Sequence, residues 1–250
     1  KIIWKKKKIN FLLSVFDHIS VKKLNKFKLK FIKIPSGEIN NYPLLKAIAK
    51  LKKKIILSTG MSNLSEIKNT LNILKKYKVK KNMIYLLHCT TDYPTKLKDV
   101  NLKSMNELQK KLKYKIGYSD HTKGNEASIA AVARGAKIIE KHFTLNKKMK
   151  GPDHSSSLEP KELIDFITSL RNTCILLGKA EKKITSSEKK NLNIVRKSIY
   201  ALKSIKKGEK FTNSNIIPKR PMNGISPIYW DKVVGKKAKR NFIKDDKIKI

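Results

Sequence analysis

The sequence predicts an α/β fold in which parallel strands alternate with helices, followed by a small β-rich domain. Three observations carry this prediction. Short apolar runs recur at intervals of roughly 21 to 32 residues, which is the length of one strand with its crossover helix. Small or ionisable residues follow the ends of these runs. Beyond Gly178 the pattern gives way to short runs broken by proline and glycine.

Six runs rich in β-branched, aliphatic and aromatic residues are predicted to be strands. Regular alternation with helices requires a parallel sheet, because each helix carries the chain back to the edge at which the next strand starts in the same direction. The predicted strands cover residues 10–16, 31–35, 54–58, 83–88, 114–118 and 136–143. The predicted helices cover residues 42–53, 63–78, 101–113, 125–135 and 159–177, the last with Pro160 in its first turn and Gly178 just past its end.

The placement of polar residues favours a (β/α) barrel over a doubly wound sheet. In a barrel the carboxyl ends of all strands meet at one rim, whereas a doubly wound sheet brings together mainly the ends at its switch point. Only six strand-helix units are visible, however, and a closed barrel needs eight. The five run ends that carry such residues are Ser36-Gly37-Glu38, Ser58-Thr59-Gly60, residues 88–93, Ser119-Asp120-His121 and Glu140-Lys141-His142.

The chain of 250 residues is expected to divide into one large and one small domain. Residues 1–178 form the strand-helix domain in this interpretation. Residues 179–195 form a polar linker, and residues 196–250 form a compact β-rich domain.

The formal net charge of +40 raises nucleic acid and anionic membranes as partners. Only five of the 59 cationic residues are arginine, whose fork suits phosphate and base edges, and the lysines are spread along the chain. A solvated lysine-rich surface is therefore favoured, and a non-enzymatic polyanion-binding protein is the alternative. No apolar run approaches the ~18 residues of a membrane span. Two cysteines cannot form a disulfide framework, so a cytoplasmic enzyme without nucleic acid or membrane as partner is expected.

His121 and His142 each close a predicted strand and lie 21 residues apart. Neighbouring barrel strands would bring both imidazoles to one rim, where they suit a divalent transition metal with open positions. The alternative is that one of them is a core histidine hydrogen-bonded to its neighbours. The adjacent His88 and Cys89 point to opposite faces of a strand and are not expected to form a nucleophile pair.

Lys33, Ser36 and Glu38 place a cation, a hydroxyl and a carboxylate at one strand end. Lys33 and Ser36 suit an anionic group such as phosphate or carboxylate, and Glu38 suits a sugar hydroxyl or a proton transfer. Ser58 and Ser119 would add hydroxyl groups from two further strands. Ordinary turn chemistry is the alternative, since Pro-Ser-Gly is a common strand exit.

Seven ordered motifs closely resemble those of the sialic acid (N-acetylneuraminate) synthase family. They are KIPSGEINN, KIILSTGM, LLHCTTDYP, IGYSDHTKG, GAKIIEKHFTL, GPDHSSSLEP and IPKRPMNGISP. The resemblance runs from about Phe11 to the end of the chain, and it implies a (β/α)8 TIM barrel followed by a C-terminal antifreeze-like (SAF) domain. It also implies an enzyme that condenses phosphoenolpyruvate with N-acetylmannosamine, or a related N-acetylated hexosamine, to N-acetylneuraminate and phosphate. A divalent metal, Mn²⁺ or Mg²⁺, would activate the sugar aldehyde. A legionaminic or pseudaminic acid synthase of the same family is the alternative.

The resemblance also implies roles for individual residues of this sequence. His121 and His142 match the metal ligands and, with Glu38, the catalytic residues. Thr91 and Tyr93 match positions that line the sugar site. Arg220 matches an arginine that the antifreeze-like domain contributes to the partner subunit's site, which implies a domain-swapped homodimer. The residues that match phosphoenolpyruvate-binding positions are Ser14, Lys33, Ser36, Ser58 and Ser119.

The sequence departs from the family in three respects. The motif KRPMNG has Met222 where the family has a glycine, in a turn that favours glycine. Ser14 stands where the family commonly has a threonine that binds phosphoenolpyruvate. The family's first two strands, with a catalytic glutamate and a phosphate-binding lysine, have no counterpart, and the chain opens on Lys1 instead of methionine. We therefore expect a chain that lacks its first two strand-helix units and that is inactive by itself.

Overall fold

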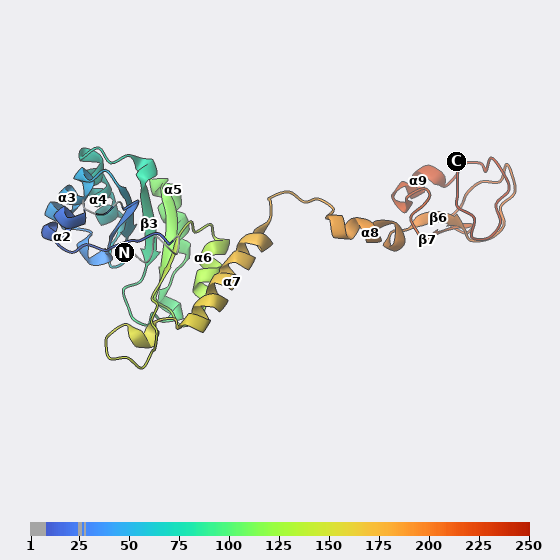
Figure 1. Ribbon diagram of the computed structural model, residues 1–250. Coiled ribbons are helices and arrows are strands. Elements are labelled where there is room, and N and C mark those ends of the chain that lie inside the picture. The colour runs from blue at the N-terminus through green and yellow to red at the C-terminus, as the bar shows by residue number, and fades with distance from the viewer. Residues whose placement is uncertain (1–8, 25–26, 28) are drawn as a thin grey trace. The chain divides into compact units, whose positions relative to one another are not determined.

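The computed structural model describes residues 9–24, 27 and 29–250, which divide into two units (Figure 1). The first unit ends at Gly178, and the second runs from Lys179 to Ile250. Within the described part of the chain, every helix is too short or too polar to cross a lipid bilayer.

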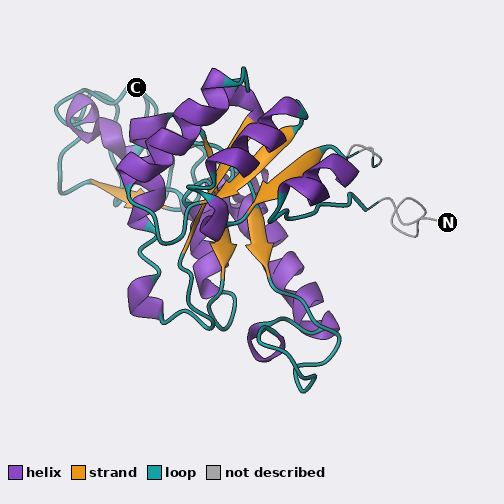
Figure 2. Cartoon of the chain, turned by 90° about the vertical axis from the view of Figure 1, so that its left-hand side faces the viewer, coloured by secondary structure: helices purple, strands orange, loops and turns teal. Residues whose placement is uncertain are grey.

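In the described part of the first unit, five parallel strands form one sheet and lie side by side in chain order. The sheet is curled like half of a barrel, with helices along it (Figure 2). This arrangement confirms the predicted α/β class with its parallel sheet. The strands are β1 (Phe31–Ile34), β2 (Lys54–Ser58), β3 (Ile84–Cys89), β4 (Lys115–Asp120) and β5 (Ile139–Lys141).

The family resemblance implies a (β/α)8 barrel that lacks its first two strand-helix units here, and the described residues form an open parallel sheet of five strands. The run 10–16 forms no strand: it touches the sheet through one bridge from Ser14 to Lys33 and one hydrogen bond from Lys33 N to Leu13 O at 3.1 Å. The last strand is also shorter than the predicted run 136–143. There the backbone of Leu158 folds back beside the chain and donates to His142 O at 2.9 Å.

Six α-helices lie in the described part of the first unit, and several of their ends follow standard capping chemistry. Asn63 and Glu66 form a reciprocal capping box at one helix start. Another helix starts at Pro160 as expected, and a third ends at Lys113 in the left-handed conformation with φ of 57°. The helices are α2 (His18–Leu24), α3 (Tyr42–Lys50), α4 (Leu64–Lys76), α5 (Lys103–Leu112), α6 (Glu126–Ala133) and α7 (Pro160–Leu177). The short 3₁₀ turns are Ser36–Glu38, Lys81–Met83, Leu97–Asp99 and His154–Ser156.

The core of this unit lies between the outer face of the sheet and the helices. Ile34 and Leu57 of the strands are fully buried, as are Leu45 of α3 and Leu74 of α4, and all four belong to one apolar cluster. Successive side chains of a strand alternate between faces, so Lys33, which precedes Ile34, points to the opposite, inner face. The alternation therefore separates a dry helix-facing layer from an inner face that carries polar groups.

The second unit is a small domain with an antiparallel pair of strands. Its core contains Ile199, Phe211 and Phe242, each at most 1% exposed. The segment predicted as a linker contains a helix whose end is bonded to this unit, because Met222 N donates to Asn193 O at 2.7 Å. The elements are α8 (Ser186–Val195), β6 (Ser198–Ala201), β7 (Ile216–Lys219), the 3₁₀ turn Pro227–Tyr229 and α9 (Trp230–Val233).

His88 of β3 is a structural histidine whose environment sets a pH dependence of stability. Its Nε2 donates to Val100 O at 2.8 Å, and burial lowers its pKa below the usual 6.5. Cys89 points the other way, with Sγ 3.3 Å from Ser36 Oγ, so the two adjacent residues form no nucleophile pair, as predicted.

We expect the His88→Gln variant to lose less stability than the native protein when the pH is lowered. Well above pH 6.5 the imidazole is neutral in both the folded and the unfolded protein. As the pH falls through 6.5, the unfolded chain binds a proton that the folded chain binds only at lower pH. The free energy of unfolding therefore decreases. The glutamine keeps a donor for Val100 O but cannot titrate. Thermal unfolding midpoints between pH 7.5 and 5 would show a steeper fall for the native protein than for the variant, and parallel curves would contradict this assignment.

Candidate functional site

A pocket of about 440 Å³ opens at the carboxyl ends of the five strands. Parallel strands deliver their last residues to the same edge of a sheet, which is why residues far apart in the sequence meet here. The lining is Ser14, Phe16, Lys33, Pro35, Ser36, Gly37, Ser58, Cys89, Thr91, Tyr93, Ser119, His121, Glu140, Lys141 and His142.

The two histidines reach this pocket from the ends of β4 and β5. The centroids of their rings are 5.3 Å apart, with the rings nearly perpendicular. His121 Nδ1 donates to Thr90 O at 2.7 Å, which leaves Nε2 unprotonated in the neutral ring. Burial, the largest effect, lowers the pKa of His121, so the ring is neutral at pH 7. On the other ring, Nδ1 of His142 lies 3.7 Å from Asp153 Oδ2 in the loop after β5.

These residues fit a divalent metal with open coordination positions. A backbone carbonyl that fixes the tautomer of an imidazole is the usual outer partner of a metal-binding histidine, and His121 has one in Thr90 O. Among the described residues there is no cluster of three or more histidine, cysteine, aspartate or glutamate side chains suited to a metal ion. A metal held by His121 and His142 would therefore leave several positions for oxygen atoms of a substrate or water.

Tyr93 covers the two imidazoles. The centroid of its ring is 4.2 Å from that of His121 and 5.4 Å from that of His142. Burial and the nearby acidic groups raise the pKa of Tyr93, so its hydroxyl stays protonated and can donate a hydrogen bond. A protonated phenol beside the neutral imidazole of His121 suits a polar, uncharged ligand such as a sugar.

The other half of the pocket holds a buried cation among hydroxyl groups. Lys33 is 5% exposed, and its Nζ lies 3.4 Å from Glu140 Oε1, which also accepts from Ser119 Oγ at 2.7 Å. Ser58 Oγ is buried without a hydrogen-bond partner in the described part of the chain. A buried hydroxyl without a partner is costly unless a ligand binds it, and with a lysine nearby the matching ligand is an anion.

Gly60 packs against this half of the pocket so closely that a side chain would not fit. Its N–H donates to Ser36 Oγ at 3.0 Å, which orients that hydroxyl. A Cβ atom at this position would lie 2.3 Å from Thr91 Oγ1 and 2.9 Å from Ser36 Oγ. The lack of a side chain at Gly60 therefore allows Ser36 after β1 and Thr91 after β3 to lie this close to its backbone.

Nine of the eleven residues predicted for the site line the pocket, and two do not. Glu38 lies in the 3₁₀ turn after β1, where its Oε2 accepts from Asn41 Nδ2 at 2.6 Å. Arg220 belongs to the second unit, where its Nε donates to Val195 O at 2.7 Å. The nine are Ser14, Lys33, Ser36, Ser58, Thr91, Tyr93, Ser119, His121 and His142.

Glu140 is a pocket residue that the sequence analysis left without a role. It faces Ser119 across the paired strands and contacts Lys33 from β1. The signal was present, because Glu140 and His142 are two apart and must share a face of the same strand.

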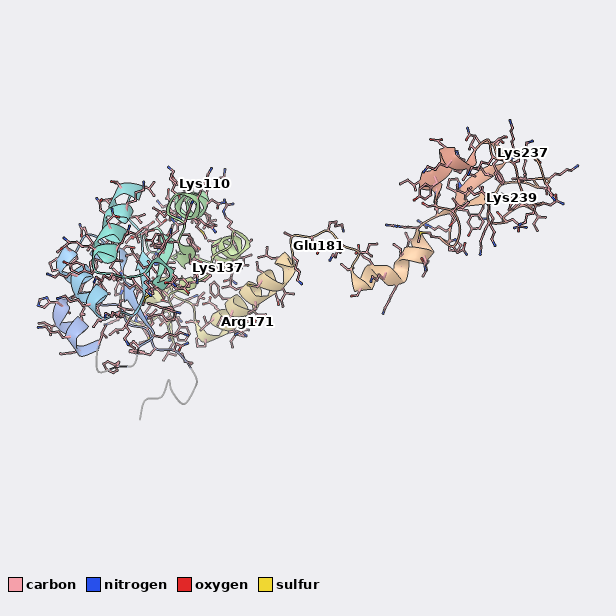
Figure 3. All side chains as sticks on the ribbon, turned by 90° about the horizontal axis from the view of Figure 1, so that it is seen from above. Lys110, Lys137, Arg171, Glu181, Lys237 and Lys239 are labelled. Carbon is pink, nitrogen blue, oxygen red and sulfur yellow. The ribbon has the colours of Figure 1, made fainter. Side chains whose placement is uncertain are left out.

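The many lysines are not gathered at this pocket. Exposed cations labelled in Figure 3 lie on different elements, and the second unit carries its own. This spread is what a solvated lysine-rich surface predicts. The labelled cations are Lys110 of α5, Lys137 before β5, Arg171 of α7, and Lys237 and Lys239 of the second unit.

Two family models match the chain, and together they cover nearly all of it. The NeuB family model matches residues 2–182, and the SAF domain model matches residues 196–249.

Individual relatives agree with these matches. The N,N'-diacetyllegionaminic acid synthase of Campylobacter jejuni is 54% identical over 98% of this chain and 73% of its own length. The pseudaminic acid synthase of the same organism is 35% identical over 94% of this chain and 68% of its own length. The crystal structure of the sialic acid synthetase of Leptospira borgpetersenii in complex with citrate is 38% identical, with a TM-score of 0.69, over 75% of this chain and 65% of that one. The chain belongs to the NeuB family and carries a C-terminal SAF domain.

Proposed function

We propose that this protein, in the form in which its barrel is complete, condenses phosphoenolpyruvate with an N-acetylated hexosamine and consumes one water molecule to give a nine-carbon acidic sugar and phosphate. The observation that carries the proposal is one pocket that joins a buried lysine and an unpartnered buried hydroxyl, Lys33 and Ser58, to the imidazole pair His121 and His142. Membership of a family with named sugar-acid synthases supports it.

The anionic substrate belongs in the half of the pocket that contains Lys33. The ammonium group of Lys33 neutralises part of the charge of phosphoenolpyruvate, and the serine hydroxyls donate to its phosphate and carboxylate oxygens. Lys33 contacts Glu140 in the free protein, so a bound anion competes with that carboxylate for the ammonium group. The hydroxyls assigned to this task are those of Ser14, Ser36, Ser58 and Ser119.

The sugar belongs beside the imidazoles. His121 and His142 would hold Mn²⁺ or Mg²⁺, which when bound supplies electrophilic activation of the sugar aldehyde. Tyr93 and Thr91 orient the sugar through their hydroxyl groups, which line the same pocket. Glu38 is proposed as the acidic residue near the sugar, after a turn of its carboxylate away from Asn41.

The second unit is proposed to complete the site of a partner subunit. Arg220, which is exposed and held by one hydrogen bond from Nε to Val195 O, would donate to the N-acetyl group of the sugar. The working form would then be a homodimer with exchanged SAF domains.

We expect Ser58→Ala to raise the KM for phosphoenolpyruvate about ten- to a hundredfold, because a hydrogen bond to a charged group contributes about 1.5–3 kcal/mol. The KM for the sugar should change little. Steady-state release of phosphate measures both constants, and Ser65→Ala on the exposed face of α4 is the matched control. An unchanged KM for phosphoenolpyruvate would exclude Ser58 from the anion site.

Removal of the metal should abolish turnover. Chelation with EDTA, and separately His121→Ala, should reduce phosphate release to background, and added Mn²⁺ should restore only the chelated native protein. His154→Ala is a matched control, because His154 Nδ1 contacts Thr144 Oγ1 at 2.7 Å and does not line the pocket. Sugar-dependent turnover that survives chelation would contradict the proposed site.

The diacetylated precursor of legionaminic acid should be the preferred sugar. The relative with 54% identity is a legionaminic acid synthase, whereas the pseudaminic and sialic relatives described above are 35% and 38% identical. Values of kcat/KM for this sugar, for the pseudaminic acid precursor and for N-acetylmannosamine would rank the three. A higher value for N-acetylmannosamine would identify a sialic acid synthase instead, and no turnover with any of them would contradict the proposed function.

A further inference from the structure

A buried ion pair joins the two strands that carry the histidines. Lys141 Nζ of β5 lies 3.0 Å from Asp120 Oδ2 of β4, and the two side chains are 3% and 0% exposed. The two residues are direct partners in the parallel ladder. Each immediately precedes a histidine, since Asp120 is followed by His121 and Lys141 by His142.

Both charges of this pair are surrounded by hydrogen-bonding groups. Lys141 Nζ also donates to Thr122 O at 2.5 Å and to Gly124 O at 3.2 Å, so its three protons all have acceptors. Oδ1 of Asp120 accepts from Thr122 N at 2.9 Å and from Thr122 Oγ1 at 2.8 Å, and Oδ2 accepts from Ser128 Oγ at 2.6 Å. The pair thereby ties β5 to β4 and to the loop that follows His121.

Such a pair specifies geometry more than it adds stability. Desolvation of two charges offsets most of their attraction, and the best-supported use of buried polar pairs is to fix register. Register is critical here because β5 has three residues and thus few ladder contacts. A slip of one residue would turn His142 and Glu140 to the helix side and bring Lys141 to the inner face.

We propose that Asp120 and Lys141 are a positioning pair that locks the register of β4 and β5 and so holds His121 and His142 on one face of the sheet, ready to share a metal. This inference rests on the proposed function, since it assigns the metal site its support. Lys141 also borders the pocket, but its Nζ is bound to Asp120, Thr122 O and Gly124 O, so the proposal needs no contact of either side chain with the metal or the substrate.

Three variants separate positioning from stability. Lys141→Met leaves a buried, unpaired carboxylate and should be the least stable, while Asp120→Asn combined with Lys141→Met removes both charges and should recover much of the lost stability. Affinity for Mn²⁺ should behave differently. We expect a loss of about tenfold or more in Asp120→Asn, in Lys141→Met and in the double variant, as for other outer partners of metal-binding histidines.

Binding of Mn²⁺ alone, followed by the electron paramagnetic resonance of the free ion, gives the affinity without turnover. Urea unfolding of the same samples gives the stability and the folded fraction by which the affinity is normalised. Lys111→Met is the matched control, because it breaks an exposed ion pair with Glu107 on α5 and should change neither quantity appreciably. If Lys141 acted only through its charge, its removal would reduce repulsion of the cation and Lys141→Met would bind Mn²⁺ more tightly. This result is opposite to the prediction.

The outcomes separate this inference from the proposed function. Native affinity in the double variant would overturn the positioning role, as would tighter binding by Lys141→Met. If His121→Ala also bound Mn²⁺ like the native protein, the metal site itself would be wrong. Loss of affinity in His121→Ala and in all three variants, with stability recovered in the double variant, would support both.

Discussion

The parallel pairing of β4 with β5 is the contact on which the candidate site depends. Its rungs join Tyr118 to Ile139, Ser119 to Glu140 and Asp120 to Lys141. Because side chains alternate along a strand, one ladder assigns hydroxyl, carboxylate and imidazole groups to the inner face and the ion pair to the helix side. The pairing of these three residues of β5 therefore determines both which groups face the pocket and which groups pack toward the helices.

Charge at the pocket is set by local partners and not by the net charge of the chain. Although the formal charge is +40, the buried cations at the sheet have carboxylate neighbours. Lys33 lies near Glu140, and Lys141 is paired with Asp120. Exposed lysines are screened by solvent and ions, so they contribute little field within the pocket. The charge that a small ligand meets in this pocket is therefore set mainly by these two ion pairs.

Local patterns were sufficient to predict the elements that depend on local interactions. The strand over 54–58 and the helix starting near Pro160 follow from alternation and capping, which a short stretch of sequence contains. The predictions of strand bounds are wrong where contacts with residues far away in the sequence determine them. The run 10–16 makes a single bridge, and the end of the run 136–143 pairs with Leu158 instead of continuing β5. Helix α8 was missed because its contacts, such as Met222 with Asn193, come from the next domain.

The candidate site also contains residues that the sequence predicts and contacts that it does not. Ser58, Ser119 and His121 meet in the pocket because each ends a strand, and strand ends are visible in a sequence. The contact between Glu140 and Lys33 crosses the sheet from β5 to β1, so it does not follow from the spacing of residues along the chain. Glu38 instead makes a local contact with Asn41, three residues further on, and the order of strands and helices does not specify which way its side chain turns.

The loop after β5, yellow in Figure 1, is fastened at both ends to the strand that carries His142. Thr144 N donates to Leu158 O and Leu158 N donates to His142 O, each at 2.9 Å, while Asp153 lies in the span between. Neither hydrogen bond involves a side chain or a residue within the span, so the residues between these two anchors can change in number or type while the backbone at His142 keeps both bonds.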